Sequence, residues 1–192
     1  MPKILSPKIV PKSRQEIEDS IPSLPKGFGI IGCDQSYGCT GLVYADRTGV
    51  VFETVIPSKT LGIGRLLELE SRIVGFLKLH HTSVFCLEGY SRGSENRREE
   101  AGEVASCIKL LMYRMQIPTY VIAPTSVKLF MTGKGNAKKD MMVEASFLTP
   151  QLLAEKRSKQ VREAVSDALG VCLSGLSIIT DPTSEVAFTK VV

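Results

Sequence analysis

The sequence predicts an α/β fold in which a mixed five-stranded sheet has helices on both faces. Short apolar segments with strand-like patterns, bounded by glycine, proline and polar turns, occur at five places. The expected strands are 29–34, 41–45, 50–56, 83–88 and 119–123. The first three follow one another through short connections, which predicts three antiparallel strands. Helical segments separate the later strands, and this order predicts that they are parallel.

Four segments place apolar residues at the helical spacing of three and four positions. The expected helices are 61–80, 96–115, 136–147 and 154–174. Asn136 can cap the third helix, Pro150 follows it, and Gly175 is expected to end the fourth. Because each helix must bury its apolar side, we expect the helices to cover both faces of the sheet.

The length of 192 residues suffices for one well-buried domain and is too short for two of typical size. No stretch approaches the roughly 20 apolar residues that a membrane span needs. The N-terminus also lacks the apolar core of a secretory signal. We therefore expect a cytoplasmic protein with no membrane partner.

Residues 1–26 differ in composition from the rest of the chain. They contain five prolines and scattered lysines. This composition predicts a flexible or loosely docked extension, with the folded domain over residues 27–192.

The cysteines are five in number, irregularly spaced, and without a C-x-x-C pair. This pattern favours reduced, buried thiols and argues against a zinc site. The cysteines are Cys33, Cys39, Cys86, Cys107 and Cys172.

Two acidic residues each close an apolar segment that is predicted to be a strand, namely Asp34 and Glu88. A carboxylate at the end of a buried strand is costly unless a partner satisfies it. A divalent cation such as Mg²⁺, which prefers oxygen ligands, is the partner we expect. If both strands are central and parallel, the two carboxylates emerge side by side at one edge of the sheet.

Two further acids, Glu163 and Asp167, lie one turn apart on the last predicted helix and share a face. Like charges at this spacing repel by a few tenths of a kcal/mol. A cation bound between the two carboxylates would make their interaction favourable. The apolar stripe of this helix lies on another side. An ordinary solvated face is therefore the alternative to a metal-binding pair.

The chain has a net charge of +4 and a pI near 8.8, which permits nucleic acid as a partner without requiring it. Basic residues gather close in sequence to the acidic positions. They are Arg92, Arg97, Arg98, Lys134, Lys138 and Lys139. Each cluster alone could be a solvated face, but its closeness to the acids favours contact with DNA.

Five segments occur in an order that is typical of one nuclease family. They are Gly32–Gly41, Cys86–Tyr90, Ala123–Lys128, Thr132–Lys139 and Val161–Leu169. Together they resemble the RuvC-like Holliday junction resolvases of bacteria and phages, within the RNase H-like nuclease superfamily. The resemblance covers roughly residues 28–175, and its specificity comes from the ordered set rather than from a single motif.

The sequence departs from the family pattern at two positions. Gln35 stands where many members have proline, which is compatible with a phage-type branch. In the last helix Glu163 precedes Asp167 by four residues, whereas an aspartate at a spacing of three is common. Asp167 is thus the firm match and Glu163 the weaker one.

The resemblance implies an Mg²⁺-dependent endonuclease that cuts four-way DNA junctions in the cytoplasm of a bacterium or a phage-infected host, with Mn²⁺ as a substitute metal. Asp34 would bridge two metal ions about 3.5–4 Å apart, while Glu88 and Asp167 would hold one each and Glu163 would assist. The clustered lysines and arginines would contact phosphates, which gives salt-dependent affinity. Tyr90 would stack on an unpaired base, unless it is a partly buried loop residue.

Symmetric cleavage of a junction also implies a homodimer. The second predicted helix is the candidate interface, and the same residues could instead pack on the sheet. They are Val104, Cys107, Ile108, Leu111 and Met115. Two alternative functions remain: a nuclease of the same fold that cuts RNA–DNA hybrids or flaps, and a non-catalytic junction-binding protein.

Overall fold

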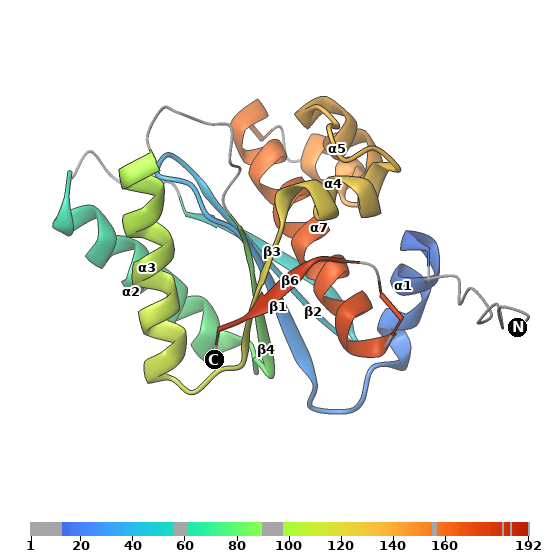
Figure 1. Cartoon of the computed structure of the whole chain (residues 1–192), viewed down its shortest axis with the longest axis horizontal. Coiled ribbons are helices and arrows are strands. Elements are labelled where there is room, and N and C mark those ends of the chain that lie inside the picture. Colours follow the sequence, from blue (N-terminus) through green and yellow to red (C-terminus); the bar gives the residue numbers. More distant parts are fainter. Residues whose placement is uncertain are drawn as a thin grey trace, which may run out of the picture.

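A computed structural model describes residues 13–55, 61–89, 98–154, 157–181, 183–184 and 186–191. These residues form a sheet in the order β3-β2-β1-β4-β5-β6 between two helical layers (Figure 1). The strands are β1 Gly29–Asp34, β2 Thr40–Asp46, β3 Gly49–Val55, β4 Val84–Glu88, β5 Thr119–Ile122 and β6 Phe188–Lys190. The helices are α1 Arg14–Ser20, η1 Ile21–Ser23, α2 Ile63–Leu79, α3 Arg98–Arg114, α4 Pro124–Thr132, α5 Lys139–Ala145, α6 Thr149–Ala154 and α7 Lys159–Thr180.

The strand directions confirm the predicted mixed sheet. β1, β2 and β3 are antiparallel neighbours, whereas β4 and β5 continue the sheet parallel to β1. The structure adds a sixth strand, β6, which pairs antiparallel with β5. The sequence did not predict β6 because it is three residues long and exposed along its length, so it lacks an apolar pattern.

Side chains alternate between two cores, one on each face of the sheet. On one face, Ile31 and Phe85 pack against α2 and α3. On the other face, Ile30 and Cys86 pack against α7. All five cysteines are free thiols and all but Cys107 are buried, as the sequence predicts.

Helix α3 directs most of the predicted dimer residues toward the sheet. Val104, Ile108 and Leu111 are buried there, and Cys107 is half-buried. Only Met115, one residue beyond the helix, is exposed. This face of α3 is therefore core, and the prediction that it forms the dimer interface is wrong for its buried members.

Helix α7 lies so close to β1 and β2 that Gly32 of β1 and Gly41 of β2 have no room for a side chain. A Cβ on Gly41 would overlap the carbonyl oxygen of Ala164, and a Cβ on Gly32 would overlap the carbonyl oxygen of Ala168. The predicted stop at Gly175 is wrong, because α7 continues to Thr180. The glycine is needed instead for packing, since a Cβ there would overlap the Cys86 sulfur.

By length and composition α7 could span a membrane. However, 78% of its most apolar window is buried inside the protein. Its apolar character is therefore explained by its place at the centre of the fold.

The N-terminal segment differs from the predicted flexible extension over the part that the structure describes. Ile17, Ile21 and Leu24 are buried in the core beside α7. Arg14 donates a hydrogen bond to the carbonyl oxygen of Ala145, and Ser13 caps α1. Helix α1 and η1 are thus packed on the domain, while residues 1–12 lie outside the described residues.

The segment between β5 and α7 contains three short helices where the sequence predicted one. The prediction missed α4, which begins at Pro124 directly after β5. Proline is favoured at the first position of a helix, where its missing N–H costs nothing. Helix α5 begins at Lys139, three residues after the predicted cap Asn136.

We expect Gly41→Ala to lower the free energy of unfolding by about 1–3 kcal/mol or more, because the new methyl group forces α7 away from the sheet. Gly75→Ala is the matched control. Gly75 lies in α2 with open space around its Cα, so alanine should stabilise by about 0.5–1 kcal/mol through helix propensity. Urea unfolding of the three proteins measures both effects, and equal stability of Gly41→Ala and wild type would contradict the close contact.

Candidate active site

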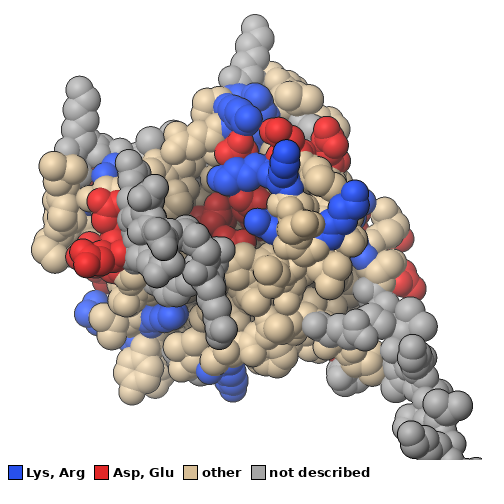
Figure 2. Space-filling model, turned by 45° about the horizontal axis from the view of Figure 1, so that its top comes forward, with Lys and Arg blue, Asp and Glu red and all other residues tan. Residues whose placement is uncertain are grey.

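Three acidic side chains from three elements meet at one rim of the sheet. Asp34 ends β1 and Glu88 ends β4, and these parallel neighbours finish together, since their last register pair is Cys33 with Leu87. Asp167 comes from the middle of α7, where the helix passes the strand ends. All three carboxyl groups line one cavity of about 230 Å³. Viewed from this side, the molecule shows a hollow with acidic atoms inside it and basic side chains around it (Figure 2).

Each of the three carboxyl groups is harder to ionise because the others lie close to it. Burial raises the pKa of Asp34 well above its ordinary value, and the neighbouring Glu88 raises it further. Burial, followed by repulsion from Asp167, raises the pKa of Glu88 to about 7. Burial and repulsion from Asp34 raise the pKa of Asp167 to about 7. A hydrogen bond between the Asp34 and Glu88 carboxyl groups lets the two share a proton.

Two lysines partly compensate this negative charge. Lys139 lowers the pKa of all three carboxyl groups, and Lys128 lowers the pKa of Glu88 and Asp167. Burial alone would lower the pKa of Lys139, but attraction to Asp167, Asp34 and Glu163 outweighs burial and raises it. Both lysines line the acidic cavity.

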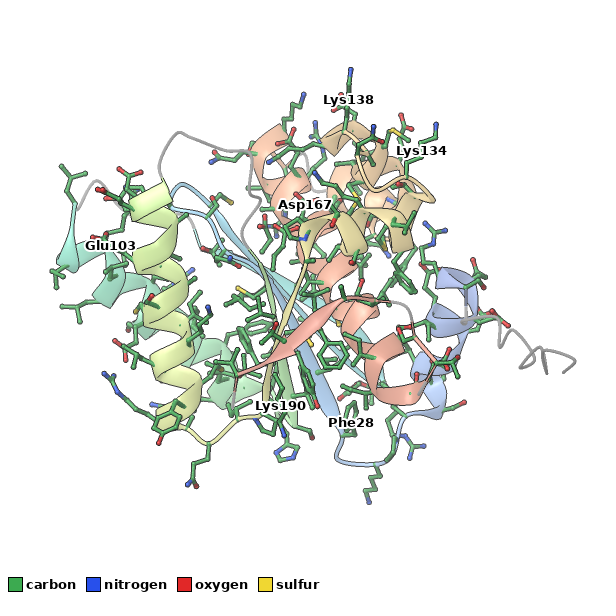
Figure 3. All side chains as sticks on the ribbon, viewed as in Figure 1. Phe28, Glu103, Lys134, Lys138, Asp167 and Lys190 are labelled. Atoms are coloured by element: carbon green, nitrogen blue, oxygen red, sulfur yellow. The ribbon has the colours of Figure 1, made fainter. Side chains whose placement is uncertain are left out.

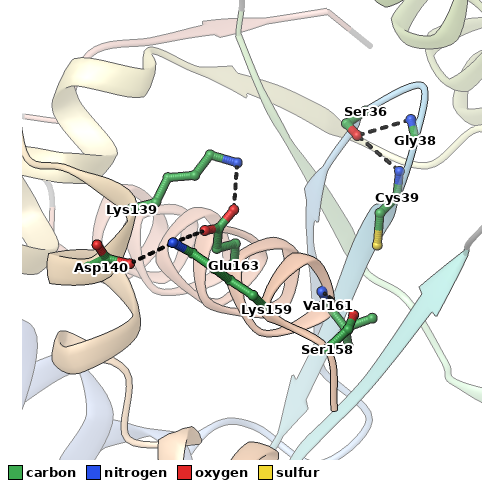
Figure 4. Close-up of polar contacts among 9 residues, drawn as sticks. All are labelled: Ser36, Gly38, Cys39, Lys139, Asp140, Ser158, Lys159, Val161 and Glu163. Atoms are coloured by element: carbon green, nitrogen blue, oxygen red, sulfur yellow. Dashed lines mark hydrogen bonds and ion pairs between the residues drawn. The ribbon is translucent and has the colours of Figure 1, made fainter.

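Glu163 lies next to the cavity without lining it. Its carboxylate is 15% exposed and forms ion pairs with Lys139 at 3.3 Å and with Lys159 at 3.7 Å (Figure 4). One turn along α7, its charge also raises the pKa of Asp167. Glu163 therefore holds Lys139 at the mouth of the cavity, and its predicted role as a metal ligand stays a prediction.

The donor set fits a divalent cation. Asp167 is buried and Asp34 and Glu88 are half-buried. Because all three carboxyl groups have raised pKa values, they gain if a cation replaces the protons that they hold, and hard cations prefer such oxygen ligands. Asp34, Glu88 and Asp167 would hold the ion. As their side chains are placed, however, no group of three or more Asp, Glu, His or Cys residues in the described part of the chain could hold a metal ion, so the three carboxyl groups would have to move closer together to bind one.

The turn after Asp34 is ordered by hydrogen bonds. The Ser36 hydroxyl accepts from the backbone N–H groups of Gly38 and Cys39 at 3.3 and 3.0 Å (Figure 4). The Thr40 hydroxyl donates to the Ser36 carbonyl oxygen at 3.1 Å. Ser36 and Cys39 consequently form a fixed wall of the cavity.

The predicted DNA-contacting residues are only partly placed. Lys134 and Lys138 are exposed and project outward above Asp167 from the segment between α4 and α5 (Figure 3). Tyr90, Arg92 and Arg97 lie outside the described residues, and Arg98 is the first residue of α3.

Sequence reasoning did not select three residues that line the acidic cavity or adjoin it. Lys128 lies one turn after Pro124, and it was missed because α4 itself was not predicted. Gln160 lines the cavity from the first turn of α7. Gln35 was noted only as a departure from proline, yet its side-chain amide donates to the Glu88 carbonyl oxygen at 2.6 Å.

Comparison with known proteins identifies the fold. No protein-family model matches the sequence, and no curated protein sequence matches it. The structure is similar to RuvC from Thermus thermophilus, with a TM-score of 0.63, 18% identity, and coverage of 83% of this chain and 99% of that chain. It is also similar to T. thermophilus RuvC in complex with a Holliday junction substrate, with a TM-score of 0.65, 17% identity and the same coverage. The RuvC-like fold implied by the sequence resemblance is thus confirmed.

The raised pKa values predict how the metal-free protein responds to pH. Glu88 keeps its proton up to about pH 7 when folded, whereas the unfolded chain loses it near pH 4.5. The unfolded state therefore binds fewer protons in this range, and stability falls as pH rises from about 4.5 to 7. Thermal unfolding in EDTA should show that wild type loses stability relative to Glu88→Gln across this range. A difference between the two proteins that stays constant with pH would contradict the assignment.

Proposed function

We propose that this chain is an Mg²⁺-dependent endonuclease that resolves four-way DNA junctions. The observation that carries the proposal is the convergence of Asp34, Glu88 and Asp167 in one basic-rimmed cavity on a RuvC-like fold. The similar T. thermophilus RuvC has a structure with a Holliday junction substrate. We propose the same substrate class for this chain, with Mn²⁺ as a substitute metal.

The chemistry proposed for the cavity is hydrolysis of a phosphodiester. Asp34, Glu88 and Asp167 would hold the metal, and the metal when bound supplies an activated water and stabilises the leaving oxygen. The carboxyl groups must be ionised for this, so they bind metal better as pH rises through about 7. Lys128 and Lys139 would pair with the phosphate beside the acids.

The surrounding basic side chains would position the DNA. Lys134 and Lys138 are exposed above the cavity, and Lys159 lies at the start of α7 beside Glu163. Contacts from such residues to phosphates carry affinity but little sequence information. We therefore propose that the protein binds branched DNA with an affinity that falls strongly as salt rises. We also propose that it acts in the cytoplasm.

Two other functions are compatible with the same fold and the same acidic residues. A nuclease with this fold could cut RNA–DNA hybrids or flaps, because the fold does not determine the substrate. A non-catalytic junction-binding protein would have little reason to keep three carboxyl groups in one cavity, since their mutual repulsion opposes folding at neutral pH. The acid set therefore favours an enzyme.

We expect Asp34→Asn to abolish Mg²⁺-dependent cleavage while junction binding is kept or tightened. Loss of several kcal/mol of metal-derived stabilisation corresponds to a rate loss of at least about a thousandfold, at roughly 1.4 kcal/mol per factor of ten. The assay uses synthetic four-way junctions, duplexes and RNA–DNA hybrids, with gel analysis of the nicks.

Asp46→Asn is the matched control for this assay. Asp46 also ends a strand, β2, but its carboxylate accepts hydrogen bonds from Thr48 and Tyr44, away from the cavity. Cleavage by this control should equal that of wild type. Equal cutting of hybrids and junctions by wild type, or undiminished cutting by Asp34→Asn, would contradict the proposed function.

Paired nicks across a junction require two active sites, so we propose a homodimer. The outer face of α2 and α3 offers exposed apolar side chains: Ile63 and Leu67 on α2, and Leu110 and Tyr113 on α3. The two helices are joined beside them by an ion pair between Glu70 and Arg114 at 3.1 Å. This face replaces the sheet-facing side of α3 as the proposed interface, and a twofold contact would bury the same residues on both copies.

We expect Leu110→Lys to raise the dimer dissociation constant tenfold or more, because a twofold interface would bury the new charge on both subunits. Leu153→Lys is the matched control, since Leu153 on α6 is as exposed as Leu110, each at 55%. Sedimentation velocity over a concentration series measures both. If Leu110→Lys dimerises as wild type does, the proposed interface on α2 and α3 is contradicted.

A further inference from the structure

Glu163 is the fourth acidic side chain near the cavity, and each of its two carboxylate oxygens pairs with a lysine. Oε2 lies 3.3 Å from the Lys139 ammonium, and Oε1 lies 3.7 Å from that of Lys159 (Figure 4). The Glu163 side chain is 15% exposed, whereas those of Lys139 and Lys159 are 62% and 68% exposed. The carboxylate is therefore the enclosed part of these ion pairs, and the lysines are the part that a ligand can reach.

These ion pairs join the first turn of α5 to the start of α7. Lys159 also pairs with Asp140 at 3.4 Å, and Asp140 directly follows Lys139 in α5. The four side chains thus form a chain of alternating charge in the order Lys139, Glu163, Lys159 and Asp140. A single exposed ion pair contributes little, but a network restricts the side chains that it contains.

Lys139 has anionic neighbours on two sides. It lines the acidic cavity, where it is attracted to Asp167 and Asp34, and it is attracted to Glu163 outside the cavity. When Asp34 and Asp167 hold a divalent cation, their attraction for the ammonium is largely cancelled. Glu163 does not line the cavity, so it remains the anion that holds Lys139 beside the site.

We propose that Glu163 is a positioning residue that keeps the Lys139 ammonium at the cavity for contact with a DNA phosphate, and that it does not bind the metal. This inference deepens the proposed function and rests on it for the identity of the ligand, a DNA phosphate. A fourth metal ligand would have to release both lysines to reach the ion. A carboxylate that only ties α5 to α7 would change stability and leave cleavage unchanged.

The first test is Mn²⁺ binding to the protein without DNA, measured by electron paramagnetic resonance. Glu163→Gln keeps the shape of the side chain and should weaken Mn²⁺ binding by less than about tenfold, because only a neighbouring charge is lost. Asp167→Asn should weaken it by at least the about 10–100-fold that even the partners of metal ligands cost. A loss in Glu163→Gln as large as that in Asp167→Asn would overturn the inference.

The second test is a double-mutant cycle on junction cleavage at saturating Mg²⁺. Glu163→Gln should lower kcat about 10–100-fold because the lysine is displaced from the reacting phosphate. The KM for DNA should not rise, since the variant removes a negative charge. In a Lys139→Met background the same change should have no further effect on kcat.

Glu144→Gln is the matched control for the cycle. Glu144 is an exposed glutamate near the other end of α5, so this variant loses the same charge and should cut as wild type does. Equal losses of kcat on introducing Glu163→Gln with and without Lys139 would overturn the inference.

If Glu163→Gln does not fold, nuclear magnetic resonance of wild type decides. The Lys139 ammonium protons should exchange with water more slowly than those of the exposed Lys134, both with and without Mg²⁺, because Glu163 remains their partner. Exchange at Lys139 that becomes as fast as at Lys134 when Mg²⁺ is added would overturn the inference.

Failure of the proposed function would look different from failure of this inference. If wild type does not cut junctions but Mn²⁺ binding and ammonium exchange behave as expected, the lysine-holding role of Glu163 stands and the substrate assignment falls. If wild type cuts junctions and Glu163→Gln loses metal binding as Asp167→Asn does, the positioning role alone falls.

Discussion

The contact between α7 and the first two strands determines most of this structure. Gly32 and Gly41 let the helix backbone lie directly on the sheet, and their replacement by any larger residue would lift it. Because α7 is buried for most of its length, its rotation about its own axis is fixed by packing. That rotation brings Asp167, an acid in an otherwise apolar stretch, to the strand ends that carry Asp34 and Glu88.

The same packing creates an electrostatic cost that the protein only partly offsets. Three carboxyl groups share one cavity and hold their protons up to higher pH than free side chains do. Lys128 and Lys139 reduce this cost, but Lys139 is itself held by Glu163 at 3.3 Å. Buried ionisable groups whose pKa values are strongly shifted by their neighbours are common at functional sites.

The sequence predicted those parts of the site that depend on strands. Asp34 and Glu88 end apolar runs, and their closeness follows once the two strands are parallel neighbours, as β1 and β4 are. The placement of Lys128 and Gln35 could not be predicted in this way. Lys128 depends on α4, which was not predicted, and the position of Gln35 depends on a side-chain hydrogen bond to a residue 53 positions away. Helix α1 was missed because prolines and lysines conceal the apolar spacing of Ile17, Ile21 and Leu24.

The proposed active site and the proposed dimer contact lie on opposite faces of the sheet. Helix α7 and the lysines of α4 and α5 lie on one face, while α2 and α3 cover the other and expose apolar side chains to solvent (Figure 1). Pairing of two copies through α2 and α3 would therefore leave both acidic cavities open. It would also separate the two sites by at least two helix layers, each about 10 Å thick. The proposed dimer would thus hold its two acidic cavities apart, an arrangement compatible with the cutting of two strands of one branched substrate.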